Sequence, residues 1–368
     1  MPPTVHYLVS AAGIPNYGDD AISAGWLRHL ARTAPDAEVV LDCVGPEQAA
    51  TSLGGLHPRL RFTDVLWRLS RAPGGREPGE AAARAARAVQ SAIPEPGGPG
   101  EELGALLEAG TIHVLGGGYL NGLCPPHLGL LAGVGAAVLR TGARAALTGV
   151  GLTPGFADDD IALNRALAPF AVVDVRDAPS ARMLRRTDVT CTGDDLFLDL
   201  GDHLYRGGDL PEVMLCAQNV PLLDLMAKTV AEWRVPESAL GLLECDPGDD
   251  RETFAEARRR WPGARAYSAA SLAAEGMPAA PGQTWITSRF HPHLVAAAAG
   301  ASGVAVEHGP AGYYSVKHRS LVEHGSAWLV TDGATVPRRP SAGGFPARRV
   351  EELQAGKREL AALIHGGR

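Results

Sequence analysis

The sequence predicts an α/β protein with two domains, and three observations support this fold class. Short apolar runs alternate with amphipathic stretches, which is the pattern of a parallel sheet covered by helices on both faces. The chain has 368 residues, more than one hydrophobic core usually serves. A polar run without periodicity, residues 201–211, interrupts the alternation and is the candidate hinge. We therefore expect two Rossmann-like domains facing across a cleft.

The first domain is expected over residues 1–205. Short apolar or β-branched runs predict its strands, and apolar residues that recur every three or four positions predict its helices. The expected strands are 5–10, 38–43, 111–115, 143–148, 171–175 and 189–192. The expected helices are 21–32, 80–92, 101–109, 128–141, 158–168 and 178–186.

The second domain is expected over residues 206–340, where the same alternation resumes. Its strands are predicted at 213–217, 240–245, 285–288, 304–306 and 327–331. Its helices are predicted at 221–232, 251–260, 292–299 and 315–324. The remaining segment, 341–368, follows a glycine- and proline-rich link, and its helix at 347–363 is expected to pack back on the first domain.

The composition narrows the class of partner. Hydrophobic residues make up 45% and charged residues 20% of the chain, as in an ordinary globular protein. The net charge of −7 argues against a nucleic-acid partner, which needs a basic footprint. The five cysteines are widely spaced and are expected to be reduced thiols. We see no signal peptide and no apolar run near the ~20 residues of a transmembrane segment, so a cytoplasmic location is expected.

The most informative motif is Ser288-Arg289-Phe290-His291, which joins a predicted strand to a predicted helix. Open α/β sheets bind their ligands at such junctions. An arginine grips phosphate or carboxylate through paired donors, and a histidine beside it can move protons near neutral pH. Arg289 and His291 are therefore the candidate catalytic residues of an enzyme that acts on a small anion.

Two further junctions are candidate substrate contacts. The first runs from Gly13 to Asp20 and offers Asn16 and Asp19 together with a helix start; Asp19 and Asp20 could equally cap that helix. The second is the triple glycine Gly116, Gly117 and Gly118, which leaves room for a substrate against bare backbone. It matches neither a Walker loop nor the GxGxxG spacing.

Arg176 and His127 complete the candidate anion contacts. Arg176 ends a predicted strand and can point into the cleft, or it can form an ion pair with Asp177. His127 follows the triple glycine and could face the same cleft. His291 and His293 diverge at a helix start, so we expect no metal site. Of the remaining histidines, some lie in or beside apolar elements (His6, His113, His324) and others are expected at the surface (His29, His57, His203, His365).

Together these motifs resemble the polysaccharide pyruvyl transferase family, because their order and spacing match over most of the chain. The matching pieces, in order, are Asn16-Tyr17-Gly18-Asp19, Gly116–Gly118, Gly149-Val150-Gly151, Arg176-Asp177 with Ser180, Thr192-Gly193-Asp194, Ser288–His291, and Tyr314 with Lys317. The chain departs from the family pattern at Phe290 (commonly leucine), at Val150 (frequently glutamine) and over residues 119–125 (usually with serine and aspartate).

The resemblance implies a two-domain fold like that of the GT-B glycosyltransferases. It implies transfer of an enolpyruvyl unit from phosphoenolpyruvate to a sugar, usually closing a cyclic ketal across two hydroxyls. Arg289 and His291 would then serve donor binding and catalysis, Arg176 would be a second anion contact, and His127 and Lys317 would line the site. No metal or organic cofactor is implied. The acceptor would be a sugar, a glycolipid or another saccharide.

Two other interpretations fit the same residues. A glycosyltransferase with a nucleotide-sugar donor would use the arginine for the diphosphate and the histidine as a base. A non-catalytic protein that binds a sugar or an anion would keep the scaffold without turnover. Response to phosphoenolpyruvate, as opposed to nucleotide sugars, discriminates among the three.

Overall fold

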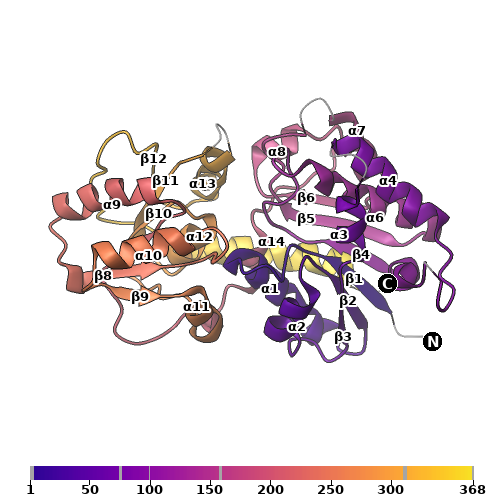
Figure 1. Ribbon diagram of the computed structural model, residues 1–368, viewed down its shortest axis with the longest axis horizontal. Coiled ribbons are helices and arrows are strands. Elements are labelled where there is room, and N and C mark those ends of the chain that lie inside the picture. Colours follow the sequence, from indigo (N-terminus) through magenta and orange to yellow (C-terminus); the bar gives the residue numbers. More distant parts are fainter. Residues whose placement is uncertain (1–3, 74–76, 99, 157–159, 310–312, 367–368) are drawn as a thin grey trace. The chain divides into compact units, whose positions relative to one another are not determined.

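The computed structural model describes residues 4–73, 77–98, 100–156, 160–309 and 313–366. The contacts divide the chain into two compact units. Unit 1 comprises Met1–Ile14, Asp19–Asp199 and Ala355–Arg368. Unit 2 comprises Pro15–Gly18 and Leu200–Gln354. Each unit contains one six-stranded sheet with helices around it (Figure 1).

The sheet of unit 1 is entirely parallel and has the order β3-β2-β1-β4-β5-β6. From β1 the chain adds strands in one direction as far as β3, and from β4 it adds them in the other direction as far as β6. The carboxyl ends of β1 and β4 therefore form a topological switch point. The strands are β1 Val5–Val9, β2 Glu38–Asp42, β3 Leu60–Thr63, β4 Thr111–Val114, β5 Arg144–Val150 and β6 Val172–Val175. The helices are α1 Tyr17–Thr33, α2 Pro46–Leu53, α3 Val65–Arg71, α4 Pro78–Ser91, α5 Gly104–Glu108, α6 Leu128–Thr141, α7 Asp160–Leu167 and α8 Ala178–Arg182.

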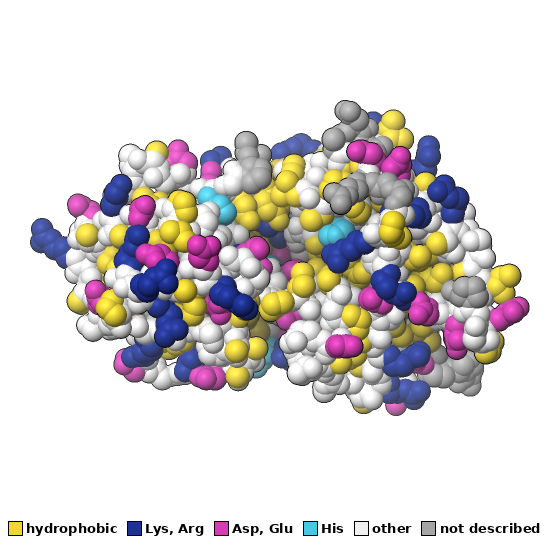
Figure 2. Space-filling view, viewed as in Figure 1, with side chains coloured by type: hydrophobic (Ala, Val, Ile, Leu, Met, Phe, Trp, Pro, Cys, Tyr) yellow, Lys and Arg dark blue, Asp and Glu magenta, His cyan; other side chains and the backbone are white. Residues whose placement is uncertain are grey.

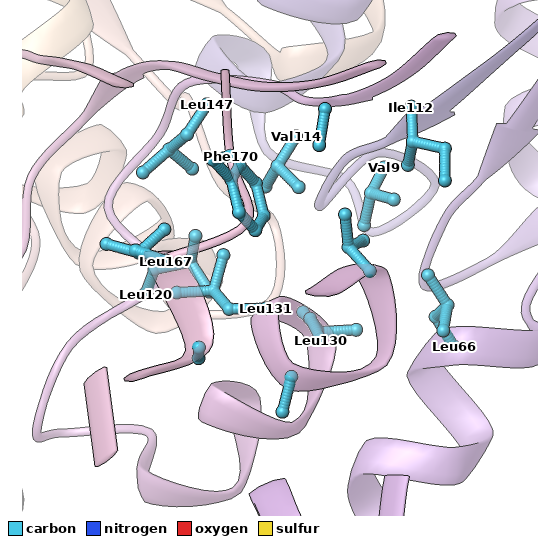
Figure 3. Close-up of a cluster of buried hydrophobic side chains, with 14 of the residues drawn as sticks. Val9, Leu66, Ile112, Val114, Leu120, Leu130, Leu131, Leu147, Leu167 and Phe170 are labelled. Carbon is cyan, nitrogen blue, oxygen red and sulfur yellow. The ribbon is translucent and has the colours of Figure 1, made fainter. Parts of the chain in front are cut away.

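The core of unit 1 lies between the sheet and helices α3 and α6 (Figure 3). Val9, Ile112 and Val114 point from β1 and β4 toward Leu130 and Leu131 of α6, and all five side chains are buried. A sheet covered on both faces requires continuous apolar strands rather than alternating ones. This is why its strands are visible in the sequence as short hydrophobic runs.

Unit 2 repeats this topology with the order β12-β11-β10-β7-β8-β9, also all parallel. Its switch point therefore lies between β7 and β10. The strands are β7 Val213–Cys216, β8 Leu240–Leu243, β9 Arg265–Tyr267, β10 Thr284–Thr287, β11 Ser302–Val306 and β12 Leu329–Thr331. The helices are α9 Val220–Glu232, α10 Arg251–Arg260, α11 Ala269–Glu275, α12 Phe290–Ala298 and α13 Tyr313–Glu323, and α14 Ala347–His365 closes the chain.

The predicted fold class, two Rossmann-like α/β units, is confirmed, but individual elements differ. The strand predicted at 189–192 is wrong: Thr190 forms only an isolated bridge with Asp174. Five elements were not predicted, namely α2, β3, α3, β9 and α11. The helix predicted at 158–168 begins at Asp160 among the described residues, and residues 158–159 lie outside them.

The charged side chains at the surface and the cysteines show no unusual arrangement. On the face drawn in Figure 2, basic and acidic side chains are interspersed rather than gathered into a broad basic patch. Within the described ranges, no helix combines the length and the apolar character that a membrane span requires. The structure has all five cysteines as thiols; Cys43, Cys216 and Cys245 are buried, whereas Cys191 is exposed.

Candidate functional site

The switch point of unit 2 gathers polar side chains from several strand ends. Gln218 and Asn219 follow β7, and Ser288 and Arg289 follow β10, its neighbour in the sheet. The two loops are joined directly, since the Gln218 backbone N–H donates to the Ser288 hydroxyl at 3.1 Å. Asn219 caps α9, its side chain accepting from the Leu222 N–H. β7 and β10 are the two strands of the switch point, and open α/β sheets bind ligands in the crevice at the carboxyl ends of such strands.

Arg289 is fixed at this crevice by carboxylates. Its Nε donates to Asp250 Oδ1 at 3.1 Å, and Nη2 donates to the same oxygen. Asp246 lies 3.7 Å from Nη1, and the exposed Asp249 lies 3.5 Å from Nη2. Burial acts to lower the pKa of Arg289, but the charge and the hydrogen bonds of Asp250 outweigh it and raise that pKa. The Nε edge is thus committed to Asp250, and the Nη1 edge faces the crevice loops.

Gln218 connects Arg289 to the end of β11. Its amide oxygen accepts from Tyr314 Oη at 2.9 Å and from Arg289 Nη1 at 3.0 Å, while its nitrogen donates to the Ser288 carbonyl at 2.9 Å. The same amide contacts His308, whose ring stacks on Tyr314 with centroids 4.3 Å apart. Burial, followed by the charges of Arg289 and Lys317, lowers the pKa of His308 to about 4. His308 is therefore a neutral neighbour of two cations at pH 7.

Lys317 projects from α13 over two aromatic rings. Its Nζ lies 3.7 Å from the centroid of Tyr313 and 5.2 Å from that of Tyr314. The charge of Lys317 is also one of the causes of the lowered His308 pKa, which places it in the same electrostatic environment as Arg289. The attraction between an ammonium group and an aromatic face holds the Lys317 side chain over these rings.

His291 stands in the first turn of α12, which begins at Phe290. Its ring meets the Phe290 ring edge to face, with centroids 5.1 Å apart. The opposite contact is with the backbone of Gly18, where a built Cβ would fall 1.7 Å from His291 Nδ1. Asn16, two residues earlier, donates to Asp246 Oδ2 at 3.1 Å. Asn16 thus contacts the carboxylate group around Arg289.

The other predicted contacts lie in unit 1. Gly116 and Gly117 lie at its switch point, but their open sides are occupied by protein side chains. A Cβ on Gly116 would fall 2.9 Å from the Asp195 carboxyl carbon, and one on Gly117 would fall 2.9 Å from Asp19 Oδ1. The Gly118 carbonyl accepts from Asn121 Nδ2 at 2.7 Å. The space predicted for a substrate at Gly116 and Gly117 is filled by Asp195, Asp19 and Tyr119.

Arg176 follows β6 and is almost fully buried. Its guanidinium lies 3.9 Å from Asp177 and 3.6 Å from Asp194. Asp177 also caps α8, accepting from the Ser180 N–H at 2.8 Å and from its hydroxyl at 2.6 Å. The ion-pair alternative for Arg176 is therefore present in the structure. The Arg176-Asp177 and Ser180 motif builds a turn beneath the sheet edge.

His127 is also enclosed. Its Nδ1 lies 2.8 Å from the Tyr119 carbonyl, its Nε2 lies 3.3 Å from Arg71, and its ring packs edge-on against Trp67 at 4.9 Å. Burial is the largest cause that lowers the pKa of His127 to about 4. His127 is a neutral packing residue at physiological pH.

The structure thus gathers Arg289, His291, Asn16 and Lys317 in unit 2, and places Arg176, His127, Asp19 and the triple glycine in unit 1. Four residues of the unit 2 crevice were not predicted: Gln218, His308, Asp246 and Asp250. Gln218 and His308 follow β7 and β11 by two residues, so the ends of these strands point to them. Asp246 and Asp250 lie in the loop after β8, which is not a strand of the switch point, and the rule does not find them. In the part of the chain that is described, no cluster of three or more His, Cys, Asp or Glu is placed to hold a metal ion.

Comparisons with known proteins agree with this architecture. The family model described as polysaccharide pyruvyl transferase matches residues 16–245; Arg289, His291 and Lys317 lie beyond that span. A comparison with curated proteins found no match. Similar solved structures include the UDP-GlcNAc 2-epimerase from Methanocaldococcus jannaschii (10% identity, 98% of this chain and 99% of that chain, TM-score 0.53). Another is Anabaena Alr3699/HepE in complex with UDP and glucose (11% identity, 98% and 95%, TM-score 0.51). At such identities the likeness shows the GT-B fold alone.

Proposed function

Because the chain belongs to the polysaccharide pyruvyl transferase family, we propose that it transfers a pyruvyl unit from phosphoenolpyruvate to hydroxyls of a sugar-containing acceptor. The observation that carries the proposal is the cluster of Arg289, Gln218 and His308 at the carboxyl ends of β10, β7 and β11. Arg289 and Lys317 bring two positive charges there, and His291 follows Arg289 at the start of α12. Phosphoenolpyruvate carries a phosphate and a carboxylate on one carbon, and this pair of charges needs more than one cation.

The donor is proposed to bind at the Nη1 edge of Arg289, beside Gln218 and His308. Asp250 holds Nε and Nη2 and so orients the guanidinium, and a donor at Nη1 would share or replace the contact with Gln218. Preorganised donors of this kind stabilise charge that develops on a leaving phosphate more effectively than mobile ones. Lys317, held over Tyr313, would meet the second anionic group.

The reaction balances without a metal or an organic cofactor. One sugar hydroxyl adds its oxygen to the central carbon of phosphoenolpyruvate, while the methylene carbon gains a proton and becomes a methyl group. The bond from that central carbon to the phosphate oxygen then breaks, and a second hydroxyl adds in place of phosphate. The products are a cyclic ketal of pyruvate and inorganic phosphate.

His291 is proposed as the acid/base group of this sequence, because protons must be removed from the hydroxyls and supplied to the methylene carbon. Replacement by alanine is expected to lower turnover by about 10²–10⁴-fold. His203, exposed in unit 2, offers the matched control: His203→Ala is expected to retain the wild-type rate.

The predicted substrate contacts in unit 1 stay predictions. Arg176, His127, Gly116 and Gly117 each have a structural contact that accounts for the residue without a ligand. We therefore base the proposal on the unit 2 residues. We expect the unit 1 residues to act mainly through their structural contacts and less through direct contact with the substrate.

The test is phosphate release from phosphoenolpyruvate against a panel of saccharide acceptors, with mass spectrometry of the acceptor for the added ketal. Release that depends on acceptor and is lost in His291→Ala supports the proposal. Stabilisation by nucleotide sugars and not by phosphoenolpyruvate would replace it with glycosyl transfer. Binding of phosphoenolpyruvate without release against any acceptor would leave a binding protein.

A further inference from the structure

The short segment Pro15–Gly18 follows β1 in sequence and includes the first two residues of α1, but it belongs to unit 2 by its contacts. Its attachment is specific. The Tyr17 N–H donates to the Cys245 carbonyl at 3.1 Å, just beyond β8. The Asn16 side chain accepts from the Gly18 N–H at 3.0 Å and donates to Asp246 Oδ2 at 3.1 Å. These bonds fix the backbone of residues 16–18 against the loops that surround Arg289.

Gly18 is the point where this segment meets His291. A Cβ at Gly18 would fall 1.7 Å from Nδ1, 2.1 Å from Cε1 and 2.4 Å from Cγ of the imidazole. Real Cβ contacts do not occur at these separations, so the ring occupies the space that a side chain would need. Gly18 is not among the glycines with positive φ, so any residue could adopt its backbone conformation. Position 18 requires glycine because the His291 imidazole occupies the space that a side chain would need.

Asn16 reaches the second site residue through one intermediary. The Asp246 oxygen that accepts from Asn16 is the same oxygen that lies 3.7 Å from Arg289 Nη1. This edge of Arg289 is the one that Asp250 leaves open. One carboxylate oxygen is thus shared between the segment and the guanidinium, while the other oxygen of Asp246 accepts from the Gly248 and Asp249 N–H groups.

We propose that Asn16-Tyr17-Gly18 is a positioning segment for the unit 2 site. Gly18 sets the rotamer of the His291 imidazole by providing the wall against which the ring lies. Asn16 holds Asp246 at the Nη1 edge of Arg289. The segment acts through these two side chains and does not itself contact the substrate, in contrast to the direct substrate contact predicted for Asn16 from sequence. The effect on turnover that we infer rests on the proposed function. The placement of the His291 ring and of Asp246 by this segment does not.

The geometric content is tested by the histidine imidazole NMR signals of the full chain, with His291 assigned by its absence in His291→Ala. In Gly18→Ala the His291 signals are expected to move. Gly207→Ala is the matched control, because a Cβ there meets nothing within 4 Å, and it should leave those signals unchanged. His291 signals in Gly18→Ala that are identical to those of the wild type would overturn the proposal.

A double-mutant cycle based on melting temperatures covers the case in which Gly18→Ala does not fold. The double variant Gly18→Ala/His291→Ala lacks the ring that the new methyl group would strike, so it is expected to fold and to melt close to His291→Ala. Contacting residues give such non-additive results, whereas independent sites give additive ones. An equal loss of melting temperature from Gly18→Ala in both backgrounds would overturn the role assigned to Gly18.

Kinetics then tests the consequence for the proposed reaction. Gly18→Ala is expected to lower kcat at least tenfold while KM for phosphoenolpyruvate stays within twofold, because the acid/base group moves and the anion contacts do not. Asn16→Ala is expected to raise KM with the His291 signals unchanged; an unchanged KM removes Asn16 from the segment. Should the wild-type protein release no phosphate from phosphoenolpyruvate, the proposed function fails, and the NMR and thermal results still decide the positioning role.

Discussion

The Nζ of Lys357 lies 2.8 Å from Oδ1 of Asp195, and both side chains are completely buried. The same ammonium lies 2.9 Å from Asp174. Asp195 also accepts from Trp26 Nε1 and from the Gly116 N–H, both at 2.9 Å. Buried charge is tolerated only when it is paired and hydrogen-bonded. The part of α14 that belongs to unit 1 is thus anchored beneath β5 and β6 by one ammonium between two carboxylates.

Lys357→Met is therefore expected to be strongly destabilising, since it leaves two carboxylates without their cation in a buried place. Breaking a buried pair in this way costs about 3–5 kcal/mol. The measurement is the thermal unfolding of the full chain, compared with Lys228→Met, which alters an exposed lysine of α9. Equal melting temperatures for the two variants would contradict the anchoring role.

A histidine cluster beside this anchor predicts acid sensitivity. His365 of α14 lies 3.0 Å from His113 and 3.3 Å from His6; the surface position expected for His365 was wrong in this respect. Burial is the largest cause that lowers the pKa of His6 to about 4 and that of His113 to about 3. Burial, followed by the charges of His113 and His6, places the pKa of His365 well below its usual value.

Because these folded-state pKa values lie below the unfolded value of 6.5, the unfolded chain binds more protons at acid pH. The stability contribution is complete above pH 6.5 and is lost as the pH falls toward 4. A histidine that is neutral in the folded state and protonated in the unfolded chain costs at most about 1.4 kcal/mol per pH unit in that window. Melting temperature between pH 7 and pH 4.5 is expected to fall less steeply in His365→Phe than in wild type. His203→Phe should follow wild type; a parallel slope for all three would refute the account.

The triple glycine yields a stability prediction in place of a binding one. Asp195 faces Gly116 and is held by Thr148, Trp26 and Lys357, so it cannot yield to an added methyl group. Gly116→Ala is expected to destabilise by about 1–3 kcal/mol through overpacking. Gly55→Ala, where a Cβ meets nothing within 4 Å, is the control and should be neutral or slightly stabilising. A raised KM for phosphoenolpyruvate with an unchanged melting temperature would instead favour the substrate contact.

The sequence predicts most of the fold because strands buried on both faces leave unmistakable apolar runs. It fails where burial is incomplete. β3 and β9 are edge strands of three or four residues, and every side chain in them except Tyr267 is exposed or half-buried. Conversely, residues 189–192 have strand composition, but Asp174 accepts from Thr190 and Thr192 side chains and fixes that segment as a loop. Side-chain hydrogen bonds of this kind have no periodic signal.

The candidate site is predicted in part for a similar reason. Arg289 and His291 are recognisable because a strand-to-helix junction carries two unusual side chains. His308 and Gln218 are ordinary residues in sequence, and only the strand order brings the ends of β7, β10 and β11 together. Arg176 illustrates the reverse case, in which the sequence suggests a ligand contact that a distant residue accounts for. Arg176 follows β6, as a ligand contact would, but Asp194, eighteen residues later, pairs with it.

His308 offers the most direct test of where the donor binds. Its pKa is lowered to about 4 by burial and then by the charges of Arg289 and Lys317. An anion bound between these cations would offset their charge and would therefore raise the pKa of His308. A neighbouring opposite charge shifts a pKa by about 1–3 units. By linkage, the affinity for the anion should increase as the pH falls toward the raised value.

The measurement is a histidine NMR titration with and without saturating phosphoenolpyruvate, with His308 assigned by its loss in His308→Gln. An upward shift of about one unit or more is expected for His308, and none is expected for the exposed His203. Inorganic phosphate should produce a smaller shift, since it lacks the carboxylate that would meet the second cation. A donor that binds with its usual affinity and leaves the His308 titration where it was must occupy another part of the molecule, because no trianion can lie between Arg289 and Lys317 without altering the charge that His308 experiences.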